Sequence, residues 1–167
     1  MEFRRAVEDD INSIMKIIKQ AQDYLKEQGV NQWQNNYPNF ETIKNDIMNQ
    51  YGYVLLKDLH VIGTVAVSFD GEKNYQSIYD GAWISNYEYA VIHRIAVDQG
   101  YKGCGYSSVI IKNIEEICLN KGIHSIKVDT HEENKSMQRL LQKNGFLYCG
   151  IIYTEDKSKR IAFEKVL

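Results

Sequence analysis

The spacing of apolar residues changes along the chain, and each kind of spacing predicts one kind of element. Alternating, β-branched and aromatic stretches predict strands at 2–7, 53–57, 61–69, 90–97, 124–129, 146–154 and 160–166. Apolar residues three or four positions apart predict helices that begin near Asp10, Gly105 and Asn134 and end near Gly29, Asn120 and Gly145. Another helix is expected from about Phe40, with Ile43, Ile47 and Met48 on its inward face. Either Asp9 or Asp10 could cap the first helix.

This order of elements predicts an α/β fold, with a mixed sheet and helices on both of its faces, in one domain over residues 1–167. The strands at 90–97 and 124–129 are expected to run parallel, because a long helix connects them. Residues 70–88 form an aromatic-rich insertion between two strands.

Composition and charge narrow the function classes. The chain has 167 residues, of which 44% are apolar and 25% charged, as is typical of one globular domain. Its net charge of -2 argues against sequence-independent nucleic-acid binding, which needs an excess of cations. No apolar run reaches the ~20 residues of a membrane helix and the N-terminus has no signal core, so we expect a cytoplasmic protein with no membrane partner. Cys104, Cys118 and Cys149 form no zinc pattern, so no metal is expected.

A glycine-rich turn between the strand at 90–97 and the following helix carries the clearest chemistry. Gly100, Gly103 and Gly105 allow the backbone to approach a ligand, and the helix N-terminus carries partial positive charge. Lys102 adds a full positive charge. The turn therefore predicts an anion site, although it matches neither the dinucleotide fingerprint nor the P-loop. A tight turn without a ligand is the alternative.

The stretch from Ile92 to Phe146 resembles the core of the GNAT acetyltransferase superfamily. The run Ile95-Ala96-Val97 precedes Lys102-Gly103-Cys104-Gly105-Tyr106-Ser107, where the family has Gln/Arg-x-x-Gly-x-Gly/Ala, and Asn134 and Gly145-Phe146 follow at the family's spacing. Lys102 and Ser107 depart from the usual residues at the two ends of that motif. The resemblance extends over nearly the whole chain and implies a single-domain GNAT-like fold. Its central sheet would be mixed, mostly antiparallel, and of about six or seven strands.

The resemblance also implies an acetyl-CoA-dependent N-acetyltransferase, in which an amine of a small molecule or peptide attacks the thioester directly. The pyrophosphate of acetyl-CoA, the co-substrate, would bind the backbone N–H groups of Lys102, Gly103, Cys104, Gly105, Tyr106 and Ser107. The pantetheine arm would pair with Ile95, Ala96 and Val97, and the Ile95 N–H would polarise the thioester carbonyl. Asn134 would contact the pantetheine region, with a helix N-cap as its alternative role.

Proton transfer requires two further groups, because only a neutral amine attacks and the departing thiolate must be protonated. His93 is the candidate base, since alternation places it on the same strand face as Ile95 and a member of the family has histidine at the matching position. The alternative for His93 is a hydrogen bond within the sheet. Leu141 stands where many members have a tyrosine that acts as the general acid. Tyr106, Tyr148, Tyr153 or a water could protonate the thiolate instead.

The missing tyrosine leaves two other functions open. One is a non-catalytic acyl-CoA-binding regulatory or sensor module of the same fold. The other is a nucleotide-binding α/β domain that uses the same turn for phosphate.

Two segments rich in aromatic and amide side chains, 31–40 and 75–89, predict the acceptor site. Aromatic faces attract cations and therefore suit an amine. The candidate substrate-binding residues are Trp33, Tyr37, Tyr79 and Trp83. These rings could instead pack over the sheet or form the surface of a homodimer.

Overall fold

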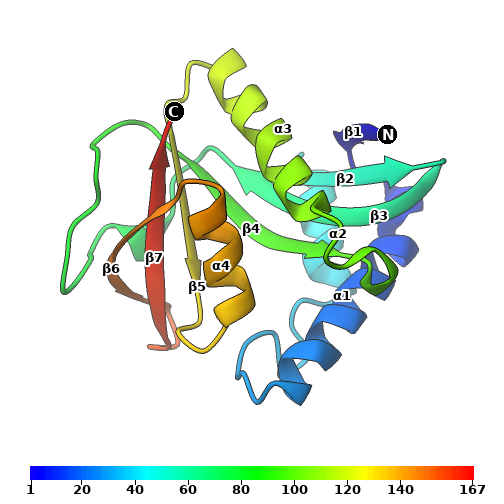
Figure 1. Cartoon of the computed structure of the whole chain (residues 1–167), viewed down its shortest axis with the longest axis horizontal. Helices are drawn as coiled ribbons and strands as arrows, with labels where there is room; N and C mark the ends of the chain where they lie inside the picture. Colours follow the sequence, from blue (N-terminus) through cyan, green and yellow to red (C-terminus); the bar gives the residue numbers. More distant parts are fainter. The chain divides into compact units, whose positions relative to one another are not determined.

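The computed structural model describes every residue from Met1 to Leu167. Its strands are β1 (Glu2–Arg5), β2 (Gly52–Lys57), β3 (His60–Ser68), β4 (Ala90–Val97), β5 (Ser125–Thr130), β6 (Leu147–Tyr153) and β7 (Lys159–Val166). Its helices are α1 (Ile11–Glu27), α2 (Phe40–Met48), α3 (Tyr106–Asn120) and α4 (Lys135–Lys143), and they are drawn with the strands in Figure 1. None of these helices is both long enough and apolar enough to span a bilayer.

The seven strands form one sheet in the order β1-β2-β3-β4-β5-β7-β6. The pairs β1–β2, β2–β3, β5–β7 and β6–β7 are antiparallel, and β4–β5 is parallel, as the long connecting helix predicted. The predicted α/β fold with a mostly antiparallel sheet is therefore confirmed. Backbone contacts group the chain into two units, Met1–Val67 with His93–Asn113 and Ser68–Ile92 with Ile114–Leu167.

In the first unit, α1 and α2 cover one face of β2 (Figure 1). Ile14 and Ile18 of α1 and Ile43 of α2 form a buried cluster with Val54 and Leu56 of β2. Their spacing in α1 is the apolar period that predicted this helix.

The opposite face of β2 and β3 receives the first half of α3. Here β3 carries Gly63, and a Cβ at this position would lie only 2.8 Å from Cδ1 of Ile110 and 3.6 Å from Cβ of Leu55. The missing side chain lets α3 lie close to β3. This close packing positions the beginning of α3, where the glycine-rich turn ends.

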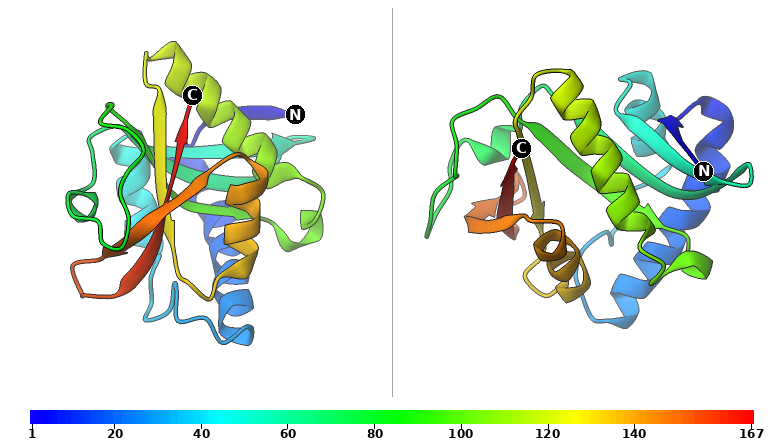
Figure 2. Two further views of the ribbon diagram at one scale, coloured as in Figure 1. Left: turned by 60° about the vertical axis from the view of Figure 1, so that its left-hand side comes forward. Right: turned by 45° about the horizontal axis from the view of Figure 1, so that its top comes forward.

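In the second unit, the insertion between β3 and β4 is an extended loop with a single short 3-10 turn at Lys73–Tyr75 (Figure 2). Tyr75 packs against Val91, Ile152 and Ala162 of the sheet. The buried carboxylate of Glu164 on β7 fastens the loop, because it accepts hydrogen bonds from the Ile84 N–H at 2.6 Å and from the Ser85 hydroxyl at 2.5 Å.

The insertion also contacts the edge of the sheet. The Tyr79 N–H donates to the Ile151 carbonyl of β6 and the Ile151 N–H donates to the Tyr79 carbonyl, both at 2.8 Å. Gly81 lies so near that a Cβ there would meet the carbonyl oxygen of Cys149 at 1.9 Å.

Asp10 precedes α1 as predicted, but its side chain makes no capping hydrogen bond to that helix. Its carboxylate instead accepts from the Val7 N–H at 2.8 Å and from both terminal nitrogens of Arg4, at 2.8 and 3.1 Å. The Arg4 guanidinium offers two charged donors, which bind a carboxylate more strongly than a neutral N–H does.

Candidate active site

The turn between β4 and α3 lies within the first unit and is held from two sides. The Asp98 carboxylate accepts from the Gly100 N–H at 2.8 Å. The side-chain oxygen of Gln20, on α1, accepts from the Gln99 N–H at 2.9 Å. A short 3-10 turn at Gln99–Tyr101 follows, so the segment that leads to the glycines has a defined conformation.

Gly103 and Gly105 have φ angles of 77° and 81°, in the left-handed region that favours glycine. A Cβ at either position would meet no atom within 4 Å. Backbone conformation, and not crowding by the protein, therefore requires glycine at both positions. The space beside both glycines is open to a ligand.

The N–H groups that follow the glycines point out of the start of α3. The Val109 N–H donates to the Gly105 carbonyl at 3.2 Å, so Tyr106 and Ser107 belong to the first turn. Donors of a first turn have no acceptor within their own helix, and they lie at the positive end of its dipole. Left-handed glycines, the open space beside them and the N–H groups of the first turn of α3 together fit the pyrophosphate of a nucleotide-like ligand.

Lys102 is at the turn, but its ammonium is directed at α1. Its Nζ lies 3.2 Å from the centre of the Tyr24 ring. Partial burial there lowers the pKa of Lys102, and nearby Glu27 opposes that shift. The predicted positive charge is thus present next to the turn, while the exposed Cys104 and the glycines offer only backbone groups.

Tyr106, one of the candidate proton donors, has its hydroxyl engaged by a lysine. Lys57 Nζ donates to the Tyr106 hydroxyl at 3.0 Å, and this bond raises the pKa of Lys57. The same Nζ lies 5.5 Å from the centres of both the Tyr101 and Tyr106 rings. Lys57 is a second cation near the turn, and the sequence analysis did not identify it.

His93 and Ile95 lie on β4, on either side of Arg94. Burial, with the neighbouring Arg94 charge, lowers the pKa of His93 to about 4. The imidazole is therefore neutral at neutral pH, and it is a weaker base than an ordinary histidine. Ala96 is 8% exposed and Ile95 and Val97 are half-buried.

Arg94 is a residue that sequence reasoning missed. It has a φ of 51° within β4, and its side chain binds Asp46 of α2 through two bonds, from Nε at 2.8 Å and from Nη2 at 2.5 Å. Its Nη1 donates to the hydroxyl of Tyr37 at 2.9 Å. The structure thus brings Tyr37, a predicted acceptor residue, next to the strand that carries His93 and Ile95.

Trp33 has a different position from that expected of a substrate contact. It packs, half-buried, against the apolar cluster of α1, α2 and β2. This corresponds to the alternative in which the ring packs on the core. Trp33 as an acceptor contact stays a prediction.

In the second unit, Trp83 is part of an aromatic group that already holds a cation. Its indole N–H donates to the Tyr75 carbonyl at 2.9 Å. The Nζ of Lys127, on β5, lies 4.4 Å from the Trp83 ring centre and 4.1 Å from that of Tyr89. Tyr79 is 52% exposed. The cation that the Trp83 and Tyr89 rings attract in the structure is therefore Lys127 of the same chain.

Asp129 on β5 is another titratable group whose surroundings the sequence did not predict. Its Oδ2 accepts from the hydroxyl of the buried Tyr75 at 2.6 Å. Burial raises the pKa of Asp129, although the Tyr75 bond opposes that shift. The contact joins residues 54 positions apart, so no local pattern could reveal it.

Asn134 and Leu141 belong to α4. Asn134 caps this helix, because its side-chain oxygen accepts from the Met137 N–H at 3.1 Å. Its contact with a cofactor stays a prediction. Leu141, at the position of the usual tyrosine, is wholly buried.

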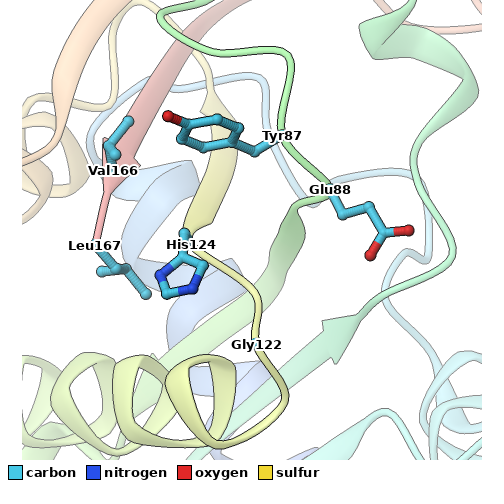
Figure 3. Close-up of a pocket in the computed structure, with 6 residues that line it drawn as sticks. All are labelled: Tyr87, Glu88, Gly122, His124, Val166 and Leu167. Atoms are coloured by element: carbon cyan, nitrogen blue, oxygen red, sulfur yellow. The ribbon is translucent and has the colours of Figure 1, made fainter.

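A pocket of about 490 Å³ lies elsewhere in the second unit, at the beginning of β5 and the end of β7 (Figure 3). It is lined by Tyr87, Glu88, Gly122, His124, Val166 and Leu167. Tyr87 and Glu88 belong to the segment 75–89 that was predicted to build the acceptor site, whereas the other four residues were not predicted for it. No group of three or more His, Cys, Asp or Glu side chains is arranged to hold a metal ion.

Comparison with known proteins identifies the family of the chain. The model of the Acetyltransferase (GNAT) family matches residues 18–146. The chain belongs to the GNAT acetyltransferase family.

One solved structure supports this family assignment, and two more distant ones share the fold. An acetyltransferase of the GNAT family from Streptococcus agalactiae 2603 has 31% sequence identity and a TM-score of 0.91, over 99% of this chain and 95% of that one. A GNAT acetyltransferase from Listeria monocytogenes 4b F2365 shares the fold at 18% identity and a TM-score of 0.76, over 99% and 94% of the two chains. A chain of the NatC complex bound to Gag peptide and CoA shares it at 14% identity and a TM-score of 0.70, over 99% and 98%. A search of curated proteins finds no match.

As a GNAT enzyme, the protein is an N-acetyltransferase that uses acetyl-CoA as its acetyl donor. The residues present fit this donor, because the left-handed glycines and the first turn of α3 offer an anion site.

Proposed function

We propose that residues 1–167 form one domain that acetylates a primary amine of a small molecule or peptide by direct transfer. The turn between β4 and α3 carries this proposal, since Gly103 and Gly105 open it to an anion next to the N–H groups of α3. The co-substrate supplies an activated acetyl group as a thioester. The amine nitrogen forms a bond to the acetyl carbon and loses one proton, the carbon–sulfur bond breaks, and the departing thiolate takes up one proton, so that CoA leaves as a thiol.

The residues predicted on β4 and in the following turn have defined parts in this transfer. The N–H groups of residues 102–107 are proposed to bind the pyrophosphate, although those of Lys102 and Cys104 donate to the carbonyls of Gln99 and Tyr101 in the structure, both at 3.3 Å, and would have to exchange these bonds. Residues 95–97 pair with the pantetheine arm. The Ile95 N–H donates to the thioester carbonyl as negative charge develops on its oxygen. His93 accepts the amine proton, since its imidazole is unprotonated at neutral pH, but burial, which lowers its pKa to about 4, also makes it a weaker base than an ordinary histidine.

The first test is release of CoA thiol from acetyl-CoA in the presence of phenethylamine, spermidine or a short peptide with a free N-terminus. We expect turnover with at least one of these amines, and an acetylated product by mass spectrometry. Tight binding of acetyl-CoA without turnover on any amine would instead indicate a sensor module. Thermal stabilisation by ATP or NAD but not by acetyl-CoA would indicate a nucleotide-binding domain.

Ser107→Asp tests the pyrophosphate site. A carboxylate in the first turn of a helix stabilises that helix by about 0.3–1 kcal/mol, but here it would repel the pyrophosphate. We expect a folded protein whose Kd for acetyl-CoA is at least about tenfold weaker, which corresponds to ~1.4 kcal/mol. Ser13→Asp is the matched control, because it places the same charge in the first turn of α1. Equal Kd values for both variants would contradict the assignment.

His93→Gln tests the base. We expect kcat to fall and the pH–rate profile of acetyl transfer to change, because His93 no longer accepts the proton. An unchanged pH–rate profile would reject His93 as the base.

A further inference from the structure

The backbone of β4 is irregular at Arg94, one residue before the proposed thioester donor. Its φ of 51° is in the left-handed region, whereas the other non-glycine residues with positive φ lie in loops and turns. An arginine in this conformation is strained and persists only where surrounding contacts hold it. A left-handed residue also turns the adjoining peptide planes away from their directions in a regular strand. One of those planes contains the Ile95 N–H.

Side-chain contacts of Arg94 supply the restraint that this backbone needs. The guanidinium and the Asp46 carboxylate form a two-bond pair in which the side chains are only 15% and 9% exposed. The planar fork of arginine fixes the direction of both bonds, which a lysine ammonium cannot do. The Tyr37 hydroxyl accepts a third bond at 2.9 Å. The side chain is thus bound to α2 on one side and to the polar segment 31–37 on the other.

We propose that Arg94 is a positioning residue, which holds β4 in a left-handed kink so that the Ile95 N–H is directed at the thioester carbonyl. Asp46 and Tyr37 form the clamp around it. The inference rests on the proposed function, because it assigns a cause to the direction of the proposed donor. It also connects the predicted acceptor segment, through Tyr37, to the reacting strand.

The direct test is an NMR measurement of the Ile95 amide proton, assigned with an Ile95→Val variant. Its chemical shift is compared between protein saturated with acetyl-CoA and protein saturated with free CoA, which lacks the thioester carbonyl. The wild-type protein is expected to show a difference, because the N–H donates to that carbonyl only with acetyl-CoA. In Arg94→Lys and Asp46→Asn this difference is expected to disappear.

Kinetics separate positioning from binding. Loss of one donor to a developing oxyanion lowers kcat by about 10²–10³-fold. We therefore expect Arg94→Lys and Asp46→Asn to lose kcat by about 10²-fold, while the KM for acetyl-CoA changes by less than about threefold. Asp46→Glu keeps a carboxylate and is expected to recover part of both the shift difference and kcat. Tyr37→Phe removes only one bond and is expected to have a smaller effect of the same kind.

The control is an ion pair of similar length that lies in the second unit. Lys165 Nζ and Glu115 Oε1 are 2.5 Å apart, with the side chains 24% and 20% exposed. Glu115→Gln should lower the thermal stability without changing the Ile95 shift or kcat. This separates a loss of stability from a loss of positioning.

The outcomes are distinct. Failure of the wild-type protein to bind acetyl-CoA would overturn the proposed function itself. The positioning role alone would be overturned if the wild type, Arg94→Lys and Asp46→Asn all bind and turn over acetyl-CoA with the same Ile95 shift difference and the same kcat. If those two variants do not fold, Tyr37→Phe decides, and wild-type values for its shift difference and kcat would overturn the role.

Discussion

Replacing Gly63 by alanine would bring a methyl group against α3. The new Cβ would lie 2.8 Å from Cδ1 of Ile110, whereas carbon atoms pack best at roughly 3.5–4.0 Å. Ile110 is wholly buried, so a rotated side chain would displace other core atoms. Overpacking of this kind costs about 1–3 kcal/mol. For a domain of this size, that corresponds to a loss of roughly 2–12 °C in Tm.

A second substitution tests whether that one contact is the cause. Ile110→Val removes Cδ1, the atom that the methyl group would meet, and alone costs about 0.5–1.5 kcal/mol. In the double variant the alanine methyl fills the vacated space, so the two costs should not add. We expect a coupling free energy of about 1–2 kcal/mol in favour of the double variant. The assay is urea unfolding, with m unchanged across the cycle.

The same cycle has a functional readout. Ile110 lies one turn after Tyr106, so a displaced α3 would move the N–H groups proposed to bind pyrophosphate. The Kd for acetyl-CoA should therefore weaken in Gly63→Ala and recover in the double variant. Gly52→Ala is the control, since its Cβ would meet nothing closer than 3.4 Å. Additive free energies, within about 0.5 kcal/mol, would refute this reasoning.

Three further substitutions have defined outcomes. Gly81→Ala would place its Cβ 1.9 Å from the Cys149 carbonyl oxygen, so the insertion should leave β6 and hydrogen exchange of the β6 amides should become faster; unchanged exchange would contradict this. Burial raises the pKa of Asp129, so the wild type should lose stability as the pH rises above about 3.9 and through that raised pKa. Asp129→Asn can still accept from Tyr75 and should abolish that loss of stability, as urea midpoints at acidic and neutral pH would show. An equal change of the urea midpoint with pH in the wild type and in Asp129→Asn would contradict this prediction. Lys102→Met removes one cation beside the turn, so calorimetry should find a weaker dependence of acetyl-CoA affinity on salt than in the wild type, and an unchanged dependence would exclude a role for its charge.

The apolar pattern was sufficient to predict the elements and most of their bounds. β4 occupies Ala90–Val97, as the alternation predicted, and α3 ends at Asn120. The turn between β4 and α3 could also be predicted from its glycines, because few other residues adopt a left-handed φ without cost. These features depend on residues that are close together in the sequence.

The groups that surround β4 and β5 depend on contacts between distant residues. Arg94 and Asp46 are 48 positions apart, and arginine has no preference for left-handed φ that would mark the kink. Lys127 resembles an ordinary strand lysine until the fold places it over the ring of Trp83. The pKa of His93 likewise depends on burial, which alternation alone does not measure.

The two hydrogen bonds between Tyr79 and Ile151 also affect how the chain can associate with others. β6 is the last strand of the sheet, and an outer strand with unpaired backbone groups is a template for aggregation. The loop takes both backbone groups of Ile151, the fifth of the seven residues in Leu147–Tyr153. Only short stretches remain on either side for an incoming strand. The insertion therefore protects the edge of the sheet. A chain whose loop has not yet docked would expose β6 to self-association.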